Sequence, residues 1–246
     1  MVLPTLYGLA YSPWTYKARW ALARKGIEYR YKEYVPMVGK IPLRVALNRW
    51  SAPLTVPLMK WDKAILDSSW AIATQADTMV DAPPLHTDLP DVQTWNEIAD
   101  RILELGRIRI SLDILDDEPA LRAALPTGLQ GLPGGLFIAR TGARYMLKTY
   151  PVSTSPSELI GQMAVHLEAV RQGLKAGDFL LGEPTYADMT IASSLQMIDP
   201  ADTQLIPLDE RLHQIWSCTR LKQDFEDLCT WRDMVMAKLD APRLGI

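Results

Sequence analysis

The sequence predicts two domains, a small α/β domain followed by a larger all-helical domain. Segments with the periodicities of strands and helices alternate through residues 1–80, and helical periodicity dominates from residue 91 to the end. The segment 81–90 is rich in proline and poor in large apolar residues, which is typical of an interdomain linker. We therefore predict domains at 1–80 and 91–246, joined by a linker at 81–90.

The composition is that of a soluble globular protein. Of 246 residues, 48% are hydrophobic and 22% are charged. The longest apolar runs are well short of the roughly 18–20 residues that span a bilayer, and the first residues lack the features of a secretory signal. The two cysteines, Cys218 and Cys229, form neither a disulfide framework nor a four-ligand zinc pattern. We expect a cytoplasmic protein with no membrane partner and no metal site.

Charge is distributed unevenly along the chain. Residues 1–85 carry 11 Lys and Arg against 6 Asp and Glu, a net charge of +5, while residues 86–246 carry 15 against 23, a net charge of −8. A basic first third suits a small anionic ligand. No run of closely spaced basic residues with interleaved aromatics is present, so the sequence does not favour nucleic acid as a partner.

The first elements of the chain predict a β-α-β unit. Residues 5–10 form a short apolar segment with the character of a strand, and Ser12 with Pro13 then marks the start of a helix. Gly26 is a suitable end for that helix. The segment 27–34 alternates between its two faces, as a half-exposed strand does.

The remainder of the first domain predicts a short helix, a hairpin and a final helix. A helix is expected near 42–48, and the apolar segments 53–61 and 64–66 flank a polar turn, as in a β-hairpin. Asp67 and the two serines after it then cap a helix that extends to residue 80. This order of elements gives a small mixed sheet with helices on its faces, which is the thioredoxin plan.

The second domain shows helical periodicity in four places. Amphipathic helices are expected at 91–115 and 156–176, a buried helix within 179–198, and a last helix near 223–239. A Gly- and Pro-rich stretch at 125–135 interrupts the pattern. The fold class is therefore α/β plus all-α, a thioredoxin-like domain followed by a helical bundle.

Ser12 is the first residue that could support chemistry. A hydroxyl at the start of a helix lies where backbone amides are unpaired and where the helix dipole is positive. A thiolate bound beside it would gain a hydrogen bond and a favourable field, and its pKa would fall. The simpler interpretation is that Ser12 only caps the helix. Tyr7 and Tyr11 are close enough in sequence to compete for the same role.

Two further positions have a structural and a functional interpretation. Pro57 before a strand can follow a cis peptide bond, which would turn the backbone of Val56 outward for a peptide-like ligand. Asp67 and Ser68 open a helix and can receive an α-amino and α-carboxylate pair, with the carboxylate on Ser68 and the helix amides. Alternatively, Asp67 and Ser68 are a capping pair. Thr185 and Asp188 have capping-box spacing and no evident chemical role.

These motifs, in this order, resemble the cytosolic glutathione transferases. YSPWTYKARWALARKGIEYRYKEY is similar to the first β-α-β unit of that family, particularly of its serine-type classes. TVPLMKWDKAILDSSWAI resembles its V-P…(D/E)-S segment, and FLLGEPTYADMTIASSL resembles its capping box in the helical domain. Between about 90 and 178 the likeness is only general helical character.

The resemblance implies a glutathione site. Ser12 matches the residue that activates the thiol of glutathione, with Tyr7 as the second choice and Tyr11 as the third. Val56 matches the residue whose backbone pairs with the cysteinyl moiety, ahead of a cis Pro57.

The two ends of glutathione are assigned in the same way. Asp67 and Ser68 match the pair that binds the γ-glutamyl end. Lys40 and Arg44 are the available cations for the glycine carboxylate.

The resemblance also implies a function, conjugation of glutathione thiolate to hydrophobic electrophiles in detoxification by a homodimer. Serine at position 12 argues against thiol–disulfide exchange, since no protein thiolate can form the mixed disulfide. Two alternatives remain open. One is a non-catalytic binding or structural module with the same fold. The other is a different glutathione-dependent reaction, such as that of an isomerase, dehalogenase or peroxidase.

Overall fold

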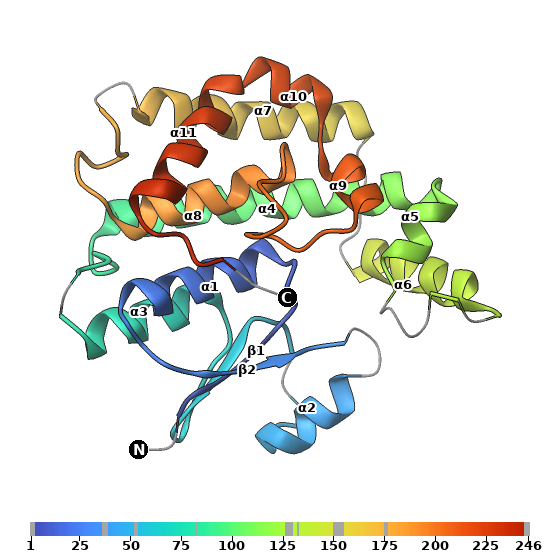
Figure 1. The fold of residues 1–246 in the computed structure, drawn as a ribbon, viewed down its shortest axis with the longest axis horizontal. Helices are drawn as coiled ribbons and strands as arrows, with labels where there is room; N and C mark the ends of the chain where they lie inside the picture. Colours follow the sequence, from blue (N-terminus) through green and yellow to red (C-terminus); the bar gives the residue numbers. More distant parts are fainter. Residues whose placement is uncertain are drawn as a thin grey trace.

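The protein folds as a four-stranded mixed sheet with helices on its faces, followed by a layer of helices (Figure 1). The computed structural model describes residues 3–35, 39–51, 54–81, 83–125, 130–131, 133–149, 155–174 and 177–243. The prediction of a thioredoxin-like domain followed by a helical domain is confirmed.

The sheet has the strand order β2-β1-β3-β4, with β1 and β2 parallel and β3 and β4 antiparallel to their neighbours. Helices α1 and α3 cover one face and α2 lies on the other (Figure 1). Successive residues of β1 point to opposite faces: Leu6 packs under α1 and α3, while Tyr7 packs against α2. The elements are β1 (Thr5–Gly8), α1 (Pro13–Arg24), β2 (Arg30–Glu33), α2 (Lys40–Leu47), β3 (Leu58–Trp61), β4 (Ala64–Leu66) and α3 (Ser69–Met79).

Strand register determines which loops meet. Tyr7 pairs with Leu58, and Met59 pairs with Leu66. The end of β1, the start of β3 and the end of β4 therefore lie together at one end of the sheet, which we call the carboxyl end of β1. Because Gly8 pairs with Glu33, β2 also finishes there.

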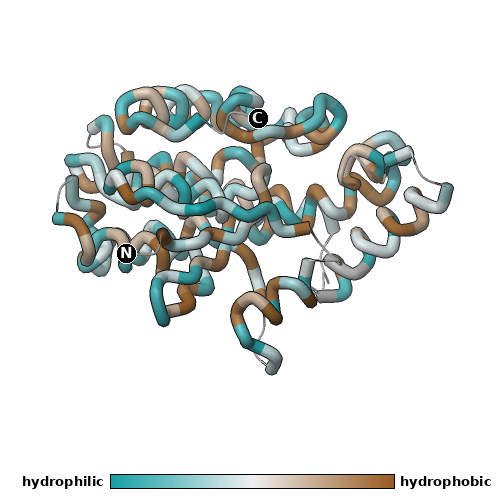
Figure 2. Tube along the Cα trace, turned by 60° about the horizontal axis from the view of Figure 1, so that its bottom comes forward, coloured by the Kyte–Doolittle hydropathy of each residue, from teal (hydrophilic) through white to brown (hydrophobic). Residues whose placement is uncertain are grey.

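The helical domain is built around α8, all of whose residues are buried. It packs against α4 and α11 within its own domain and against α1 of the first domain. In Figure 2 the outer helices alternate between hydrophilic and hydrophobic residues, as expected where each buries one face. The helices are α4 (Pro90–Leu115), α5 (Glu118–Ala123), α6 (Gly135–Thr149), α7 (Pro156–Gly173), α8 (Tyr186–Ser194), η3 (Leu195–Met197), α9 (Glu210–Trp216), α10 (Thr219–Asp224) and α11 (Glu226–Lys238).

The helical domain contains more helices than the periodicity predicted. Helices α5, α6, α9 and α10 were not expected. Three of these four have six or seven residues, too few turns to show a clear 3.6-residue pattern. The Gly- and Pro-rich stretch at 125–135 lies partly outside the described residues, and α6 begins at its end. Of the helices that the structure describes, none is long and apolar enough to cross a membrane.

A buried lysine joins the two domains. The Nζ atom of Lys17, on α1, lies 2.8 Å from Asn96 Oδ1 and 2.8 Å from Asp100 Oδ1, both on α4. The Lys17 side chain is wholly buried, whereas that of Asp100 is 34% exposed. Thr190 on α8 donates a further hydrogen bond to Asn96. Burial lowers the pKa of Lys17, and the adjacent Asp100 carboxylate opposes this shift.

A second buried lysine fixes the connection between the domains. Asp77, near the end of α3, accepts hydrogen bonds from Lys25 Nζ, from the amides of Leu85 and Thr87, and from the Thr87 hydroxyl. Burial alone would raise the pKa of the Asp77 carboxyl, but these hydrogen bonds outweigh it and hold the pKa below its usual value. The predicted linker is therefore tied to the first domain by the Asp77 carboxylate and by Lys25, which also donates to the carbonyl of Pro83 at 2.9 Å.

We expect Lys17→Met to weaken the interface between the domains. The substitution keeps the apolar stem but leaves Asn96 and Asp100 without their buried cation. Since water still reaches Asp100, we expect the free energy of unfolding to fall by about 2–3 kcal/mol, measured by urea denaturation. Lys238→Met, which removes an exposed pair with Asp178, is the control and should cost less than about 1 kcal/mol. Equal losses would contradict a special role for Lys17.

The Asp77 network should make stability depend on pH. Because the folded-state pKa of Asp77 is lowered, its contribution is present near neutral pH and is lost as the pH falls below about 4. Asp77→Asn should lower the free energy of unfolding by about 2 kcal/mol near neutral pH. Urea denaturation across the pH range should show this gap shrinking in acid. The exposed Asp81 supplies the control variant, Asp81→Asn, for which we expect no such gap.

Candidate functional site

The carboxyl end of β1 brings the predicted site residues together. β1 runs into the loop that carries Ser12. Val56 and Pro57 immediately precede β3, and Asp67 and Ser68 immediately follow β4. Since the register aligns these three strand ends, residues that are distant in sequence form one neighbourhood, with the amino termini of α1 and α3 in it.

Ser12 occupies the start of α1 without capping it. Its backbone is extended, with φ −77° and ψ 124°, and the residue is 8% exposed. Within the described part of the chain, its hydroxyl accepts no hydrogen bond from the first turn of α1. The structure therefore does not support the interpretation that Ser12 only caps α1. The hydroxyl stays available beside the positive end of the helix dipole.

The loop before Ser12 is held tightly against the first turn of α1. The amide of Leu9 donates to the hydroxyl of Thr15, at 3.2 Å, and the amide of Ser12 donates to the carbonyl of Leu9, at 3.0 Å. A Cβ atom on Gly8 would lie 2.4 Å from Thr15 Cγ2. Glycine is thus required at the end of β1 for the loop to approach the helix this closely.

The two alternative tyrosines lie in different surroundings. Tyr7 is buried beneath α2, and Lys32 Nζ lies 5.7 Å from the centre of its ring. Tyr11 meets Trp216 of α9 edge to face, with ring centres 6.4 Å apart. Burial raises the pKa of Tyr7, and burial followed by the charge of Glu33 raises the pKa of Tyr11 to about 12. Both phenols are therefore protonated near neutral pH and can serve as donors but not as bases.

The peptide bond between Val56 and Pro57 is cis. It lies directly before the first residue of β3, Leu58, which pairs with Tyr7. The backbone of Val56 therefore lies at the same end of the sheet as the loop that carries Ser12.

At the start of α3, both predicted residues already have partners. Ser68 is the N-cap, and its hydroxyl accepts a hydrogen bond of 3.0 Å from the amide of Ala71. Asp67 forms an ion pair with Arg49, whose two terminal nitrogens lie 3.3 Å from Asp67 Oδ2. Sequence reasoning missed Arg49. No local pattern joins positions 18 residues apart, and the net basic charge of residues 1–85 was the available signal.

The two predicted cations for the glycine carboxylate differ in their contacts. Lys40 is exposed at the first position of α2. Arg44, one turn later, donates from Nη1 to the carbonyl of Arg49 at 3.0 Å and to the carbonyl of Trp50. Arg44 therefore fixes the loop after α2.

Thr185 and Asp188 form a capping box at the start of α8. The amide of Ala187 donates to the Thr185 hydroxyl, while the Asp188 carboxylate accepts from the amides of Thr185 and Leu180. Burial raises the pKa of Asp188, and these hydrogen bonds oppose the shift. The pair fixes the most buried helix of the second domain.

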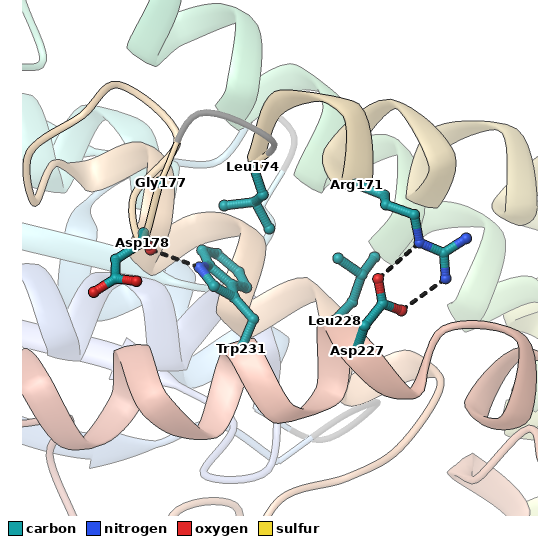
Figure 3. Close-up of a pocket in the computed structure, with 7 residues that line it drawn as sticks. All are labelled: Arg171, Leu174, Gly177, Asp178, Asp227, Leu228 and Trp231. Carbon is teal, nitrogen blue, oxygen red and sulfur yellow. Dashed lines mark hydrogen bonds and ion pairs between the residues drawn. The ribbon is translucent and has the colours of Figure 1, made fainter.

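Two cavities of about 250 Å³ each lie away from this neighbourhood. The one in Figure 3 lies between α7 and α11, where Arg171 binds Asp227 and the Trp231 indole donates to the carbonyl of Asp178. The other lies at the opposite end of the sheet, where the segment before β1, the turn after β3 and the end of α3 meet, and its lining includes Leu3 and Trp61. Neither contains a predicted site residue. Among the described residues, no three or more His, Cys, Asp or Glu side chains cluster as metal ligands.

The comparisons with known proteins agree with this architecture. Residues 11–79 match the family model of the glutathione S-transferase N-terminal domain. A glutathione transferase from Phanerochaete chrysosporium is similar over 100% of both chains, with 17% identity and a TM-score of 0.60. A glutathione S-transferase from Methylobacterium radiotolerans, in complex with glutathione sulfonate, has 16% identity over 100% of this chain and 97% of that chain, with a TM-score of 0.56.

A third similar structure is a possible glutathione S-transferase from Rhodopseudomonas palustris, with 19% identity, 95% of this chain and 93% of that chain covered, and a TM-score of 0.54. No curated protein matches the sequence. The fold is therefore that of glutathione S-transferase structures. The family-model match includes the segments that carry Ser12, Val56 and Asp67.

The Ser68 cap can be tested by stability. Ser68→Ala removes the acceptor for the Ala71 amide, and we expect the free energy of unfolding to fall by about 1 kcal/mol, measured by urea denaturation. Ser68→Thr retains a hydroxyl and should recover most of the loss. An alanine variant as stable as the original protein would show that water replaces the cap.

Proposed function

We propose that this protein binds glutathione at the carboxyl end of β1 and transfers its thiolate to hydrophobic electrophiles. One observation carries the proposal. The Ser12 hydroxyl stands at the start of α1 without capping it, at the end of the sheet that also holds the cis Val56–Pro57 bond and Asp67. The likeness to a structure in complex with glutathione sulfonate supports the same ligand.

Thiol activation follows from the environment of Ser12. A hydrogen bond from the hydroxyl and the positive end of α1 both favour the thiolate over the thiol. A fall in thiol pKa from about 8.5–9 toward neutrality raises the reactive fraction roughly ten- to hundredfold near neutral pH. The thiol proton passes to water or buffer. The sulfur lone pair then forms the new C–S bond. In a substitution the leaving group departs with its bonding electrons, and in an addition the π electrons of the double bond move to the adjacent atoms, which water then protonates.

Two aromatic residues near Ser12, one before it and one after it in the chain, contact the helical domain. Tyr11 meets Trp216 of α9, and the guanidinium carbon of Arg107, on α4, lies 4.9 Å from the centre of a Trp14 ring. The thiolate is thus expected beside aromatic side chains of both domains. Such surroundings suit an electrophile held mainly by apolar contact.

The proposal extends to assembly and location. We infer a cytoplasmic homodimer that acts in detoxification, in which the first domain of one subunit packs against the helical domain of the other. The net charges of +5 for residues 1–85 and −8 for residues 86–246 are compatible with such a pairing. A light-scattering mass equal to one chain would remove the dimer from the proposal.

We expect Ser12→Ala to abolish thiol activation. The thiolate loses a hydrogen bond whose strength is comparable to that of one oxyanion-hole donor, so kcat/KM should fall about 10²–10³-fold. The direct measurement is the ultraviolet difference spectrum of glutathione bound near neutral pH. A thiolate band should appear with the original protein and vanish in the variant. Ser155→Ala, at the exposed cap of α7, is a control that should retain the band.

The other outcomes separate the alternatives. A band that survives Ser12→Ala but disappears in Tyr7→Phe or Tyr11→Phe would transfer thiol activation to that tyrosine. Glutathione bound without a thiolate band would favour the non-catalytic module. A thiolate band without conjugation of any electrophile would favour another glutathione-dependent reaction, such as that of an isomerase, dehalogenase or peroxidase.

A further inference from the structure

The ion pair between Arg49 and Asp67 lies where the α-amino acid end of glutathione is expected. Both terminal nitrogens of Arg49 lie 3.3 Å from the same oxygen, Asp67 Oδ2. The Arg49 side chain is 27% exposed and that of Asp67 is 53% exposed, so a ligand from solvent can reach both charges. Within the described chain, Asp67 Oδ1 accepts no hydrogen bond.

The position of Arg49 is built into the loop. Asn48 ends α2 in the left-handed conformation, with φ 49°, and reverses the chain. The amide of Arg49 donates to the carbonyl of Arg44, and the Arg44 guanidinium donates back to the carbonyl of Arg49. One arginine thus fixes the backbone that presents the other.

A cation beside the start of α3 would add charged donors for a carboxylate to the few that the helix terminus offers. The sequence assigned that carboxylate to the Ser68 hydroxyl and the first amides of α3. In the structure, the Ser68 hydroxyl accepts a hydrogen bond from the amide of Ala71, and its own hydrogen is the single donor that this side chain can offer a carboxylate. A capped terminus offers fewer unpaired donors to a ligand, whereas a guanidinium offers planar paired donors that match a carboxylate.

We propose that Arg49 is a specificity-determining residue that binds the α-carboxylate of the γ-glutamyl group while Asp67 binds its α-ammonium. The inference rests on the proposed glutathione site and adds the cation to it. A zwitterion laid alongside the ion pair places each of its charges next to an opposite one. The existing pair is partly exposed and of a kind that contributes little stability, so sharing it with a ligand costs little. Thiols that lack the zwitterion, such as cysteinylglycine, are then poor substrates.

Each variant is tested with a ligand that lacks the group contacted, in the proposal, by the residue that the variant replaces. The ligands are glutathione, γ-aminobutanoyl-cysteinylglycine, which lacks the α-carboxylate, and glutaryl-cysteinylglycine, which lacks the α-amino group. Calorimetry gives Kd for each. With Arg49→Met, Kd for glutathione should rise about 10–100-fold, while Kd for the ligand without the carboxylate should stay within about 2-fold of its original value.

A second variant gives the converse result. Asp67→Asn should weaken glutathione by a similar factor and leave the ligand without the amino group nearly unaffected. Arg101→Met is the matched control, because Arg101 forms an ion pair of the same 3.3 Å length with Glu104 on α4. It should leave all three Kd values unchanged.

Each outcome decides the inference. Equal weakening of all three ligands by Arg49→Met would show that Arg49 only supports the loop, and would overturn its role in specificity. If that variant fails to fold, the two Kd values of the original protein still test the inference. Equal Kd values for glutathione and for the ligand without the carboxylate would overturn it, while glutathione binding would stand. No glutathione binding by the original protein would instead overturn the proposed function, and the inference with it.

Discussion

The buried ammonium of Lys17 sets the geometry on which the rest of the structure depends. It belongs to α1, which buries Ala18 and Leu22 against the sheet and Tyr16 and Trp20 against the helical domain. Burying a lysine is costly unless its charge is paired and hydrogen-bonded. Because the partners all lie on α4, the two domains can meet in few orientations that satisfy this charge.

The site follows from that constraint. Ser12 stands five residues before Lys17 in the chain, at the start of the same helix. Once Lys17 fixes α1 against α4, the first turn of α1 faces the helical domain, and Tyr11 and Trp14 reach Trp216 and Arg107. The sheet register independently aligns the β3 and β4 loops with that turn. The aromatic surroundings of the proposed thiolate therefore depend on both domains.

The sequence predicted those features of the structure that depend on contacts between residues close together in the chain. The capping box at Thr185 could be predicted because its partners lie within a few residues. The start of α1 could be predicted because Pro13 suits the first position of a helix, although the Ser12 side chain does not cap it. Pairs between distant positions could not. Lys17 and Asp100 are 83 residues apart, and Arg49 and Asp67 are 18 apart. Only the folded chain brings them together, and a lone lysine in a helix does not reveal whether it faces solvent or an interface.

The two helix termini at the carboxyl end of β1 are in opposite states, and this difference would let the proposed site treat the two parts of glutathione differently. α1 begins at a serine that leaves its terminus uncapped, which suits a soft anion that must stay reactive. α3 begins at a serine that caps its own helix. The Ser68 side chain then has one donor left for a ligand, and in the proposed site the Arg49–Asp67 pair adds a charge of each sign. In the proposed site, charged side chains would recognise the γ-glutamyl end while a hydroxyl and a helix dipole activate the thiol, so tight binding at one helix need not quench the nucleophile at the other.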